Sequence, residues 1–194
     1  VIKPLVFKSK ITQWLGEQNL LAWQEQKIQV PTSDILLASV DRHWFTRSIT
    51  VSIEERKRAG IWCFIEACFW FDQEGVLFEP APYTEGGLLA RVEEHRLEPI
   101  LMGEKIVEDR FLDNVLGIVS DFPHTNFSIR QIAFDRELQE LALSLYNGPK
   151  ILLSIRFDPT QNLAAFQNLR STLDISTLEY VDLRVESRIF YKPL

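Results

Sequence analysis

The chain has 194 residues, of which 27 are acidic and 21 are basic, so its formal net charge is −6 at pH 7. This negative charge argues against a nucleic-acid-binding protein. Hydrophobic residues make up 46 % and charged residues 25 % of the chain, which excludes a disordered, collagen-like or low-complexity protein. No apolar run approaches the roughly 20 residues that span a bilayer, and the first ten residues lack a signal-peptide pattern.

The uneven distribution of charge favours two domains. Residues 1–60 carry nine basic and six acidic side chains, whereas residues 61–194 carry 12 and 21. The balance changes sign at the charged run EERKR and Gly60, so we place the boundary there and expect domains of residues 1–60 and 61–194. A mildly basic first domain suits a surface near anionic lipid.

The first domain is expected to hold a helix and a β-hairpin. Over residues 7–24, apolar side chains recur at three- and four-residue steps, which predicts a helix. The segments ILLASVD and SITVSIEE alternate apolar and polar residues on either side of WFTR, which predicts two half-buried strands.

The second domain opens with signals for strands and a helix. The runs IWC and CFWF predict a hairpin, and Asp72 to Gly75 predict a turn before a short strand. We expect EPAPYTEGG (79–87) to be a surface loop because it holds two prolines and two glycines. Residues 104–120 show helical register at Val107, Phe111, Val115 and Ile118.

Strands return after this helix, in the segments FSIRQIAFD, LALSLYNG and KILLSIRF, with a tight turn at Asn147-Gly148. A helix then begins at Asp158 as N-cap and Pro159 in the first turn. Its expected buried face is Leu163, Phe166, Leu169/Arg170 and Leu173. A strand over 181–185 and a last strand over 188–191 close the chain, so the fold class is α+β.

Catalysis is the weakest functional hypothesis. The chain has three histidines, His43 in the DRHWF turn, His95 in VEEHR and His124 in DFPHTN, and each is expected to be a solvated surface side chain. No nucleophile elbow, zinc-protease helix or phosphate-binding glycine loop occurs. We therefore expect no catalytic residues, no cofactor and no metal site. We interpret the aromatic side chains as core rather than as a ligand pocket; they are Trp44, Phe45, Trp62, Phe69, Trp70 and Phe71.

The two cysteines, Cys63 and Cys68, flank the expected turn between IWC and CFWF. If they fall opposite each other in the ladder, their Cα atoms come within disulfide range. In the cytosol they would be two half-buried thiols, whereas outside the membrane a disulfide is the better interpretation.

Three segments resemble the FtsQ/DivIB family of bacterial cell-division proteins. They are residues 38–63, FDQEGVLFE (71–79) and YVDLR (180–184). The residues that match the end of the family's small POTRA domain are Val40, Arg42, Trp44, Phe45, Ile49, Val51, Ile53, Glu55 and Arg56. Asp72, Gly75 and Phe78 match the start of its larger β domain. The order of elements also agrees over nearly the whole chain.

The resemblance implies a small POTRA-like domain, with helices packed on a short sheet, followed by a larger mixed or antiparallel sheet domain with two flanking helices. The turn that follows the first POTRA strand in the family is absent, so we expect that strand to be incomplete. The resemblance further implies a single-pass protein of the cytoplasmic membrane, anchored by an upstream helix, with these domains on the extracytoplasmic side at the division septum. Such proteins are non-catalytic scaffolds that bind FtsB/DivIC-type and FtsL-type partners.

Carried over by position, the partner site is residues 184–191 at the C-terminal edge. Its residues are Arg184, Val185, Glu186, Ser187, Arg188, Ile189, Phe190 and Tyr191. An edge strand leaves main-chain groups that a partner strand can pair with, and Arg184 and Arg188 would offer charge to an acidic partner. The alternative is a C-terminal hairpin that only closes the sheet.

A rival functional class is a POTRA-containing module of a polypeptide transport or assembly system, which would also use strand addition. A single membrane helix just upstream would favour the division scaffold, whereas a downstream membrane β-barrel would favour transport.

Overall fold

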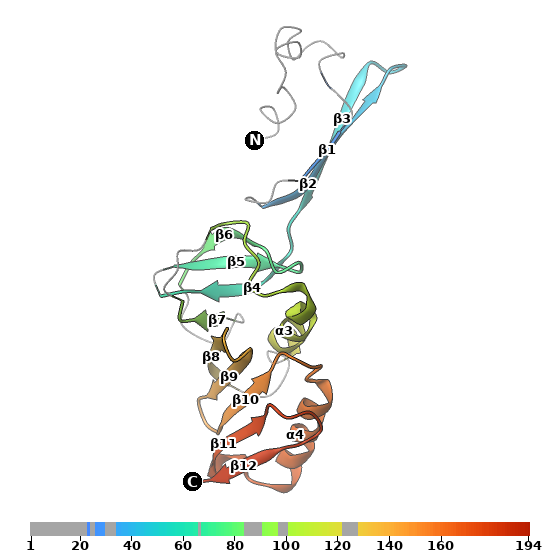
Figure 1. Ribbon diagram of the computed structural model, residues 1–194. Helices are drawn as coiled ribbons and strands as arrows, with labels where there is room; N and C mark the ends of the chain where they lie inside the picture. Colours follow the sequence, from blue (N-terminus) through green and yellow to red (C-terminus); the bar gives the residue numbers. More distant parts are fainter. Residues whose placement is uncertain are drawn as a thin grey trace. The chain divides into compact units, whose positions relative to one another are not determined.

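The computed structural model describes residues 23, 26–29, 34–65, 67–83, 91–96, 101–121 and 128–194. The chain divides into two compact units, Val1–Lys57 and Arg58–Leu194 (Figure 1). Apart from Trp23, the helix expected over residues 7–24 lies outside the described residues.

The first unit contains a three-stranded antiparallel sheet of order β1-β2-β3. Its strands are β1 (Gln26–Gln29), β2 (Ile35–His43) and β3 (Ser48–Glu55). The expected hairpin is confirmed, because β2 and β3 pair from Ile35↔Glu55 to His43↔Ser48. The expectation that β3 is half-buried was wrong, since Val51 and Ile53 are 38 % and 51 % exposed. Ala38 and Val40 are buried on one face of β2, as its alternation predicts.

The turn between β2 and β3 corrects two expectations. Trp44 and Phe45, interpreted as core residues, are 52 % and 105 % exposed. His43 ends strand β2 instead of lying in the turn, and its Nε2 is 3.1 Å from the hydroxyl of Thr50.

The second unit is built on a nine-stranded sheet of order β12-β11-β10-β9-β8-β7-β4-β5-β6. The strands are β4 (Arg58–Cys63), β5 (Cys68–Asp72), β6 (Leu77–Ala81), β7 (Arg91–Glu94), β8 (Ile129–Asp135), β9 (Glu140–Leu145), β10 (Lys150–Ser154), β11 (Leu178–Leu183) and β12 (Phe190–Pro193). The helices are α3 (Asp109–Asp121), α4 (Thr160–Thr172) and the short 3₁₀ helix η3 (Ile175–Thr177). The protein is therefore a mixed α+β chain in which sheet predominates.

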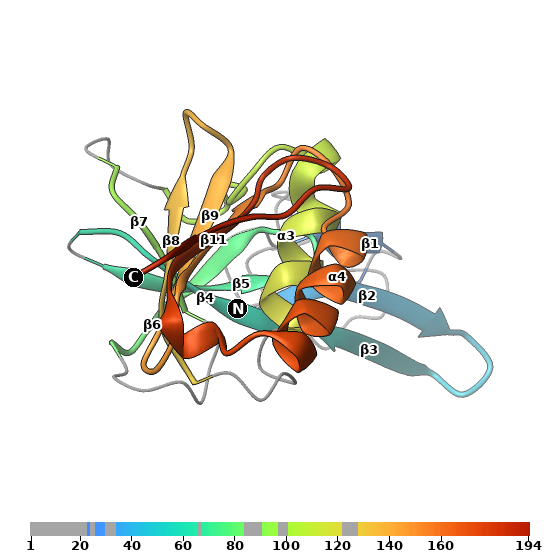
Figure 2. The ribbon, with the colours of Figure 1, turned by 90° about the horizontal axis from the view of Figure 1, so that it is seen from below.

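Sheet topology explains why α3 and α4 cover the same face. α3 connects β7 to the parallel strand β8, and α4 connects β10 to the parallel strand β11. Both crossovers start from strands of the same direction and move toward the β12 edge. Because such crossovers are right-handed, both helices fall on one side of the sheet, as Figure 2 shows.

The core lies on the helix-covered face. Trp62 is fully buried and contacts Phe71 and Phe134 edge-on, with ring centroids 5.9 and 5.2 Å apart. The apolar stripe predicted for the first of these helices is buried throughout; its members are Val107, Phe111, Val115 and Ile118. The helix itself begins at Asp109, later than the predicted start at residue 104, because Lys105 is drawn into a bridge with Val76.

The turn between β5 and β6 is built around Asp72 and Gly75. The Asp72 carboxylate is buried and accepts hydrogen bonds from the N–H groups of Glu74 and Val76, both at 2.9 Å. Gly75 has a φ of 73°, and a Cβ there would lie 2.7 Å from Leu112. Asp and Gly at these positions are therefore required by the turn itself.

Three further expectations about local structure were wrong. Glu79–Ala81 lie in β6 and not in a loop, since Pro80 is tolerated on an edge strand. Pro159, and not Asp158, is the N-cap of α4. The Asp158 carboxylate instead accepts a hydrogen bond from the N–H of Thr160. Arg170, included in the buried face, is exposed because the stripe of α4 is centred on Phe166.

A buried carboxylate joins separate parts of the core. Glu94 is 3 % exposed and accepts hydrogen bonds from Trp62 Nε1 at 2.8 Å and from Arg136 Nε at 2.6 Å. Arg136 also donates to the carbonyl oxygen of Ile106 at 2.7 Å. This network connects β4 and β7 with the end of β8 and the segment before α3.

Glu94→Gln should lower the free energy of unfolding by about 2–3 kcal/mol, because the amide presents N–H groups to the donors of Trp62 or Arg136. Glu79→Gln should lower the free energy of unfolding by less than about 1 kcal/mol, because the side chains of Glu79 and Arg58 in this ion pair are 40 % and 53 % exposed. Urea unfolding of both variants measures the difference. Equal costs would show that the buried network does not stabilise the fold.

Candidate partner-binding edge

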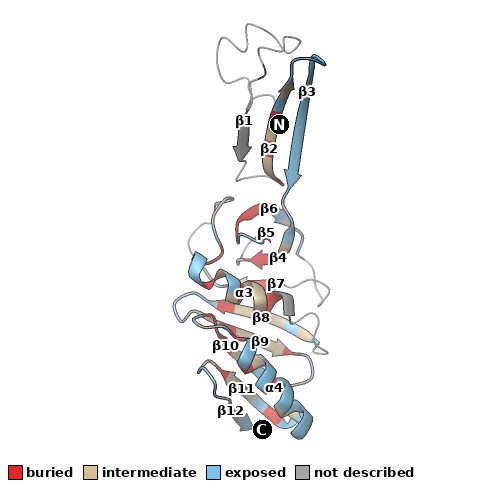
Figure 3. Cartoon of the chain, turned by 90° about the vertical axis from the view of Figure 1, so that its right-hand side faces the viewer, coloured by how far each residue is buried: buried red, intermediate tan, exposed pale blue. Residues whose placement is uncertain are grey.

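The last strand, β12, is one of the two edge strands of the nine-stranded sheet. It runs antiparallel to β11, with Asp182↔Phe190 and Val181↔Tyr191 as partners. All of its residues are exposed (Figure 3). Of the residues predicted to contact a partner, Phe190 and Tyr191 lie in this strand, and residues 184–189 form the connection that leads into it. The expectation that the strand begins at Arg188 was wrong by two residues.

The register fixes which main-chain groups of β12 face away from the sheet. The N–H of Leu194 donates to the carbonyl of Thr177 at 2.9 Å, so the main chain of Leu194 faces β11. The register shift between Leu178 and Tyr180 places the extra residue on β11 and not on β12, so inward and outward groups alternate along β12. The main-chain groups of Lys192 and Phe190 therefore also face β11, whereas those of Tyr191 and Pro193 face outward.

The two aromatic side chains of the edge lie on opposite faces of the sheet. Tyr191 opposes Val181, which is buried in the core, so Tyr191 is on the helix-covered face. Phe190 opposes Asp182 and is on the other face. Phe190 and Tyr191 are 49 % and 48 % exposed, so a strand added at this edge could cover apolar area on both faces.

A buried asparagine of α4 holds the connection between β11 and β12. Asn162 is 2 % exposed, and its Nδ2 donates to the carbonyl oxygens of Leu183 and Val185, each at 2.9 Å. Its Oδ1 accepts from the N–H of Ser187 at 3.0 Å. Ser187 has a φ of 59°, a left-handed conformation that needs support from its surroundings. The path of the chain into β12 thus depends on one side chain from a distant helix.

Sequence reasoning did not single out Asn162, although a signal was present. Asn162 precedes Phe166 by one helical turn on the face predicted to be buried. A polar side chain in a buried stripe must find hydrogen-bond partners, so its position alone indicates a structural contact.

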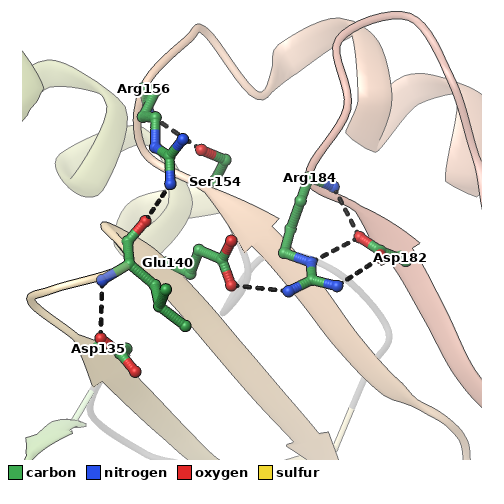
Figure 4. Close-up of polar contacts among 7 residues, drawn as sticks. Asp135, Glu140, Ser154, Arg156, Asp182 and Arg184 are labelled. Atoms are coloured by element: carbon green, nitrogen blue, oxygen red, sulfur yellow. Dashed lines mark hydrogen bonds and ion pairs between the residues drawn. The ribbon is translucent and has the colours of Figure 1, made fainter.

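Arg184 is engaged by carboxylates of its own chain (Figure 4). Its guanidinium donates through Nε and NH2 to Asp182 at 2.9 and 2.7 Å, and through NH1 to Glu140 at 2.8 Å. Hydrogen bonding by Arg184 holds the pKa of Asp182 below its usual value, and the bonds to Asp182 and then Glu140 raise the pKa of Arg184. One cation between two anions carries a net negative charge, so Arg184 does not present free positive charge to an acidic partner.

The remaining predicted contact residues differ in exposure. Val185 is 45 % exposed, and Glu186 and Arg188 are also exposed. The N–H of Arg188 donates to the carbonyl of Val185 at 3.1 Å, which closes a turn. Ile189 is partly buried and packs against the core, so it anchors the connection.

Cys63 and Cys68 are joined by a disulfide at the end of the β4–β5 hairpin. They are register partners with Cα atoms 4.0 Å apart, and the N–H of Phe64 donates to the carbonyl of Ala67 inside the loop. The pair packs with buried Ile61 and with Trp70, at a distance along the sheet from β12. The bond therefore stabilises the hairpin and does not belong to the candidate edge.

Neither histidine of the described residues belongs to β12 or to the connection that precedes it. His43 belongs to the first unit, His95 is exposed just after β7, and His124 lies outside the described residues. Within the described ranges, no three His, Cys, Asp or Glu side chains are grouped so as to hold a metal ion. In the same part of the chain, no helix has the length and apolarity that crossing a bilayer requires.

An open hollow of about 790 Å³ is lined by residues of β7 to β10 and by Arg184, and no residue of β12 lines it. Its lining includes Ala133, Ala142 and Leu152, which alternate with core residues along their strands, and it ends at Arg184. The charged groups around it include the ion pairs of Glu94 with Arg136 and of Glu140 with Arg184.

No protein-family model matches this chain, and a search of curated proteins finds no match.

Asn162→Ala should lower the free energy of unfolding by about 2–3 kcal/mol, because it leaves two carbonyls and one N–H without their partner. Amide hydrogen exchange at Ser187 should become faster in the folded variant. Asn168→Ala, an exposed position on the same helix, is the matched control and should change neither quantity. Unchanged exchange at Ser187 in Asn162→Ala would contradict the proposed anchoring.

The double change Cys63→Ser and Cys68→Ser should cost about 2 kcal/mol of unfolding free energy, the value that loop entropy gives for a short closed loop. Thiol titration of unreduced, denatured protein from an oxidising compartment should find no reactive thiol. Two reactive thiols in such material would contradict the bond.

Proposed function

We propose that this chain is the extracytoplasmic part of a single-pass division protein of the FtsQ/DivIB type. In this proposal it is a non-catalytic scaffold anchored in the cytoplasmic membrane by an upstream helix. It binds FtsB/DivIC-type and FtsL-type partners by accepting a strand along β12.

The observation that carries the proposal is the exposed edge itself. β12 ends a nine-stranded sheet, and the register turns the N–H and C=O of Tyr191 away from β11. An added strand would satisfy these groups and would cover Phe190 on one face and Tyr191 on the other. Main-chain pairing would supply affinity, and the two aromatic side chains would supply selectivity.

Positions of the motif residues support the same proposal. The pattern from Val40 to Arg56 falls on the β2–β3 hairpin and its exit, and Asp72 and Gly75 form the turn before β6. These residues resemble the family in chain order as well as in identity.

The local charges refine how a partner would be recognised. Because Arg184 is held by Asp182 and Glu140, its role in the proposal is to fix the end of β11. Arg188 is exposed on the connection and is the residue that would attract an acidic partner segment. This attraction should weaken as salt screens the charge.

Binding to the extracytoplasmic segment of the organism's own FtsB/DivIC-type protein, measured by calorimetry, tests the proposal. Tyr191→Pro removes the outward N–H without removing an inward bond to β11, and it should abolish binding. Tyr191→Ala keeps that N–H and should weaken binding by roughly tenfold through lost apolar area. Arg188→Glu should weaken binding most at low salt.

Asn168→Ala, an exposed position on α4 outside β12, is the control. It should bind like the parent chain. Parental affinity in folded Tyr191→Pro would contradict strand addition at β12. Binding lost only on changes to β3 of the first unit would favour the rival transport-module assignment.

A further inference from the structure

We infer that Pro193 limits pairing of the β12 edge with a second copy of this chain while leaving the edge able to accept a different partner strand. The part that concerns the partner rests on the proposed function. Pro193 is the last residue of β12 and is exposed. Its main chain faces away from β11, where an incoming strand would otherwise meet an N–H group.

The main-chain groups that β12 offers outward are few. They are the N–H and C=O of Tyr191 and the C=O of Pro193. Because proline has no N–H, an added strand meets one donor within β12 where an ordinary sequence would offer two. A carbonyl that approaches Pro193 is left without a hydrogen bond, which costs free energy once that carbonyl is buried.

This cost is larger for self-pairing than for pairing with a partner. Two copies of the same chain associate through a two-fold interface that uses the same residues from both copies. Antiparallel pairing of β12 with its counterpart therefore brings Pro193 into the ladder twice, and two hydrogen bonds are missing. A partner strand of different sequence meets Pro193 once, so it loses one bond.

The opposite edge of the sheet supports this inference independently. Its strand, β6, contains Pro80. The main chain of Leu77 in β6 bonds with Glu104 and Gly103 at 2.9 and 2.7 Å, so that part of the edge is covered within the chain. Both edge strands thus carry a proline, a device that limits edge-to-edge association of sheets.

Sedimentation equilibrium of Pro193→Ala tests the inference on self-association. Alanine restores the outward N–H, so the dimer dissociation constant should fall by roughly thirtyfold relative to the parent chain, the factor that two net hydrogen bonds give. Asn168→Ala changes an exposed side chain of α4 outside β12 and should associate like the parent. Adding Tyr191→Pro to Pro193→Ala should reverse the gain, because it removes the other outward donor.

The FtsB/DivIC-type segment tests selectivity on the same proteins. Its affinity for Pro193→Ala should rise by only about fivefold, as one added bond predicts. Unchanged self-association of folded Pro193→Ala would overturn the inference, and so would a partner gain that equals the gain in self-association. If the variant dimerises but neither chain binds the segment, Pro193 keeps its role against self-pairing and the proposed function fails.

Discussion

An open β-sheet has two edges, and the main-chain groups along each edge must be satisfied by something other than a neighbouring strand. The two edges of this sheet meet that requirement differently. At β6, Leu77 bonds with the segment before α3, so chain from the same unit covers part of the edge. At β12, the outward groups of Tyr191 and Pro193 face away from the sheet. This asymmetry directs attention to the C-terminal edge as the surface for a partner.

The conformation of that edge depends on side chains that lie outside it. Asn162 reaches from α4 to the connection that precedes β12, and Arg184 joins the end of β11 to β9 through Asp182 and Glu140. These contacts fix where β12 begins and which of its groups face outward. A short strand at the end of a sheet would otherwise fray, so the anchoring contacts connect the packing of the second unit to the proposed recognition.

Much of the second unit follows from local patterns in the sequence. Alternating apolar residues and the Asn147-Gly148 turn predict β9 and β10, and the buried stripe of the helix before β8 is correct residue by residue. These features depend on neighbours along the chain. The start of β12 does not, because the left-handed Ser187 is held by Asn162 from another element, and local propensity favours a strand from Arg188.

The charge presented near the edge could not be predicted from local sequence patterns either. From the sequence alone Arg184 is a cation next to a partner site, yet Glu140 becomes its neighbour only through the order of strands in the sheet. Likewise, the effect of Pro193 on strand pairing can be inferred only from the register, which shows that its main chain faces outward. Patterns within a segment were predictable, whereas contacts set by sheet order were not.

Residue-resolved amide hydrogen exchange, with and without a saturating FtsB/DivIC-type segment, tests the central claim most directly. The N–H of Tyr191 faces outward and should exchange rapidly in the free chain, then slowly in the complex. The N–H of Leu194 already bonds to Thr177, and the N–H of Lys192 faces β11, so both should change little. Unchanged rapid exchange at Tyr191 in the saturated complex would contradict strand addition at this edge.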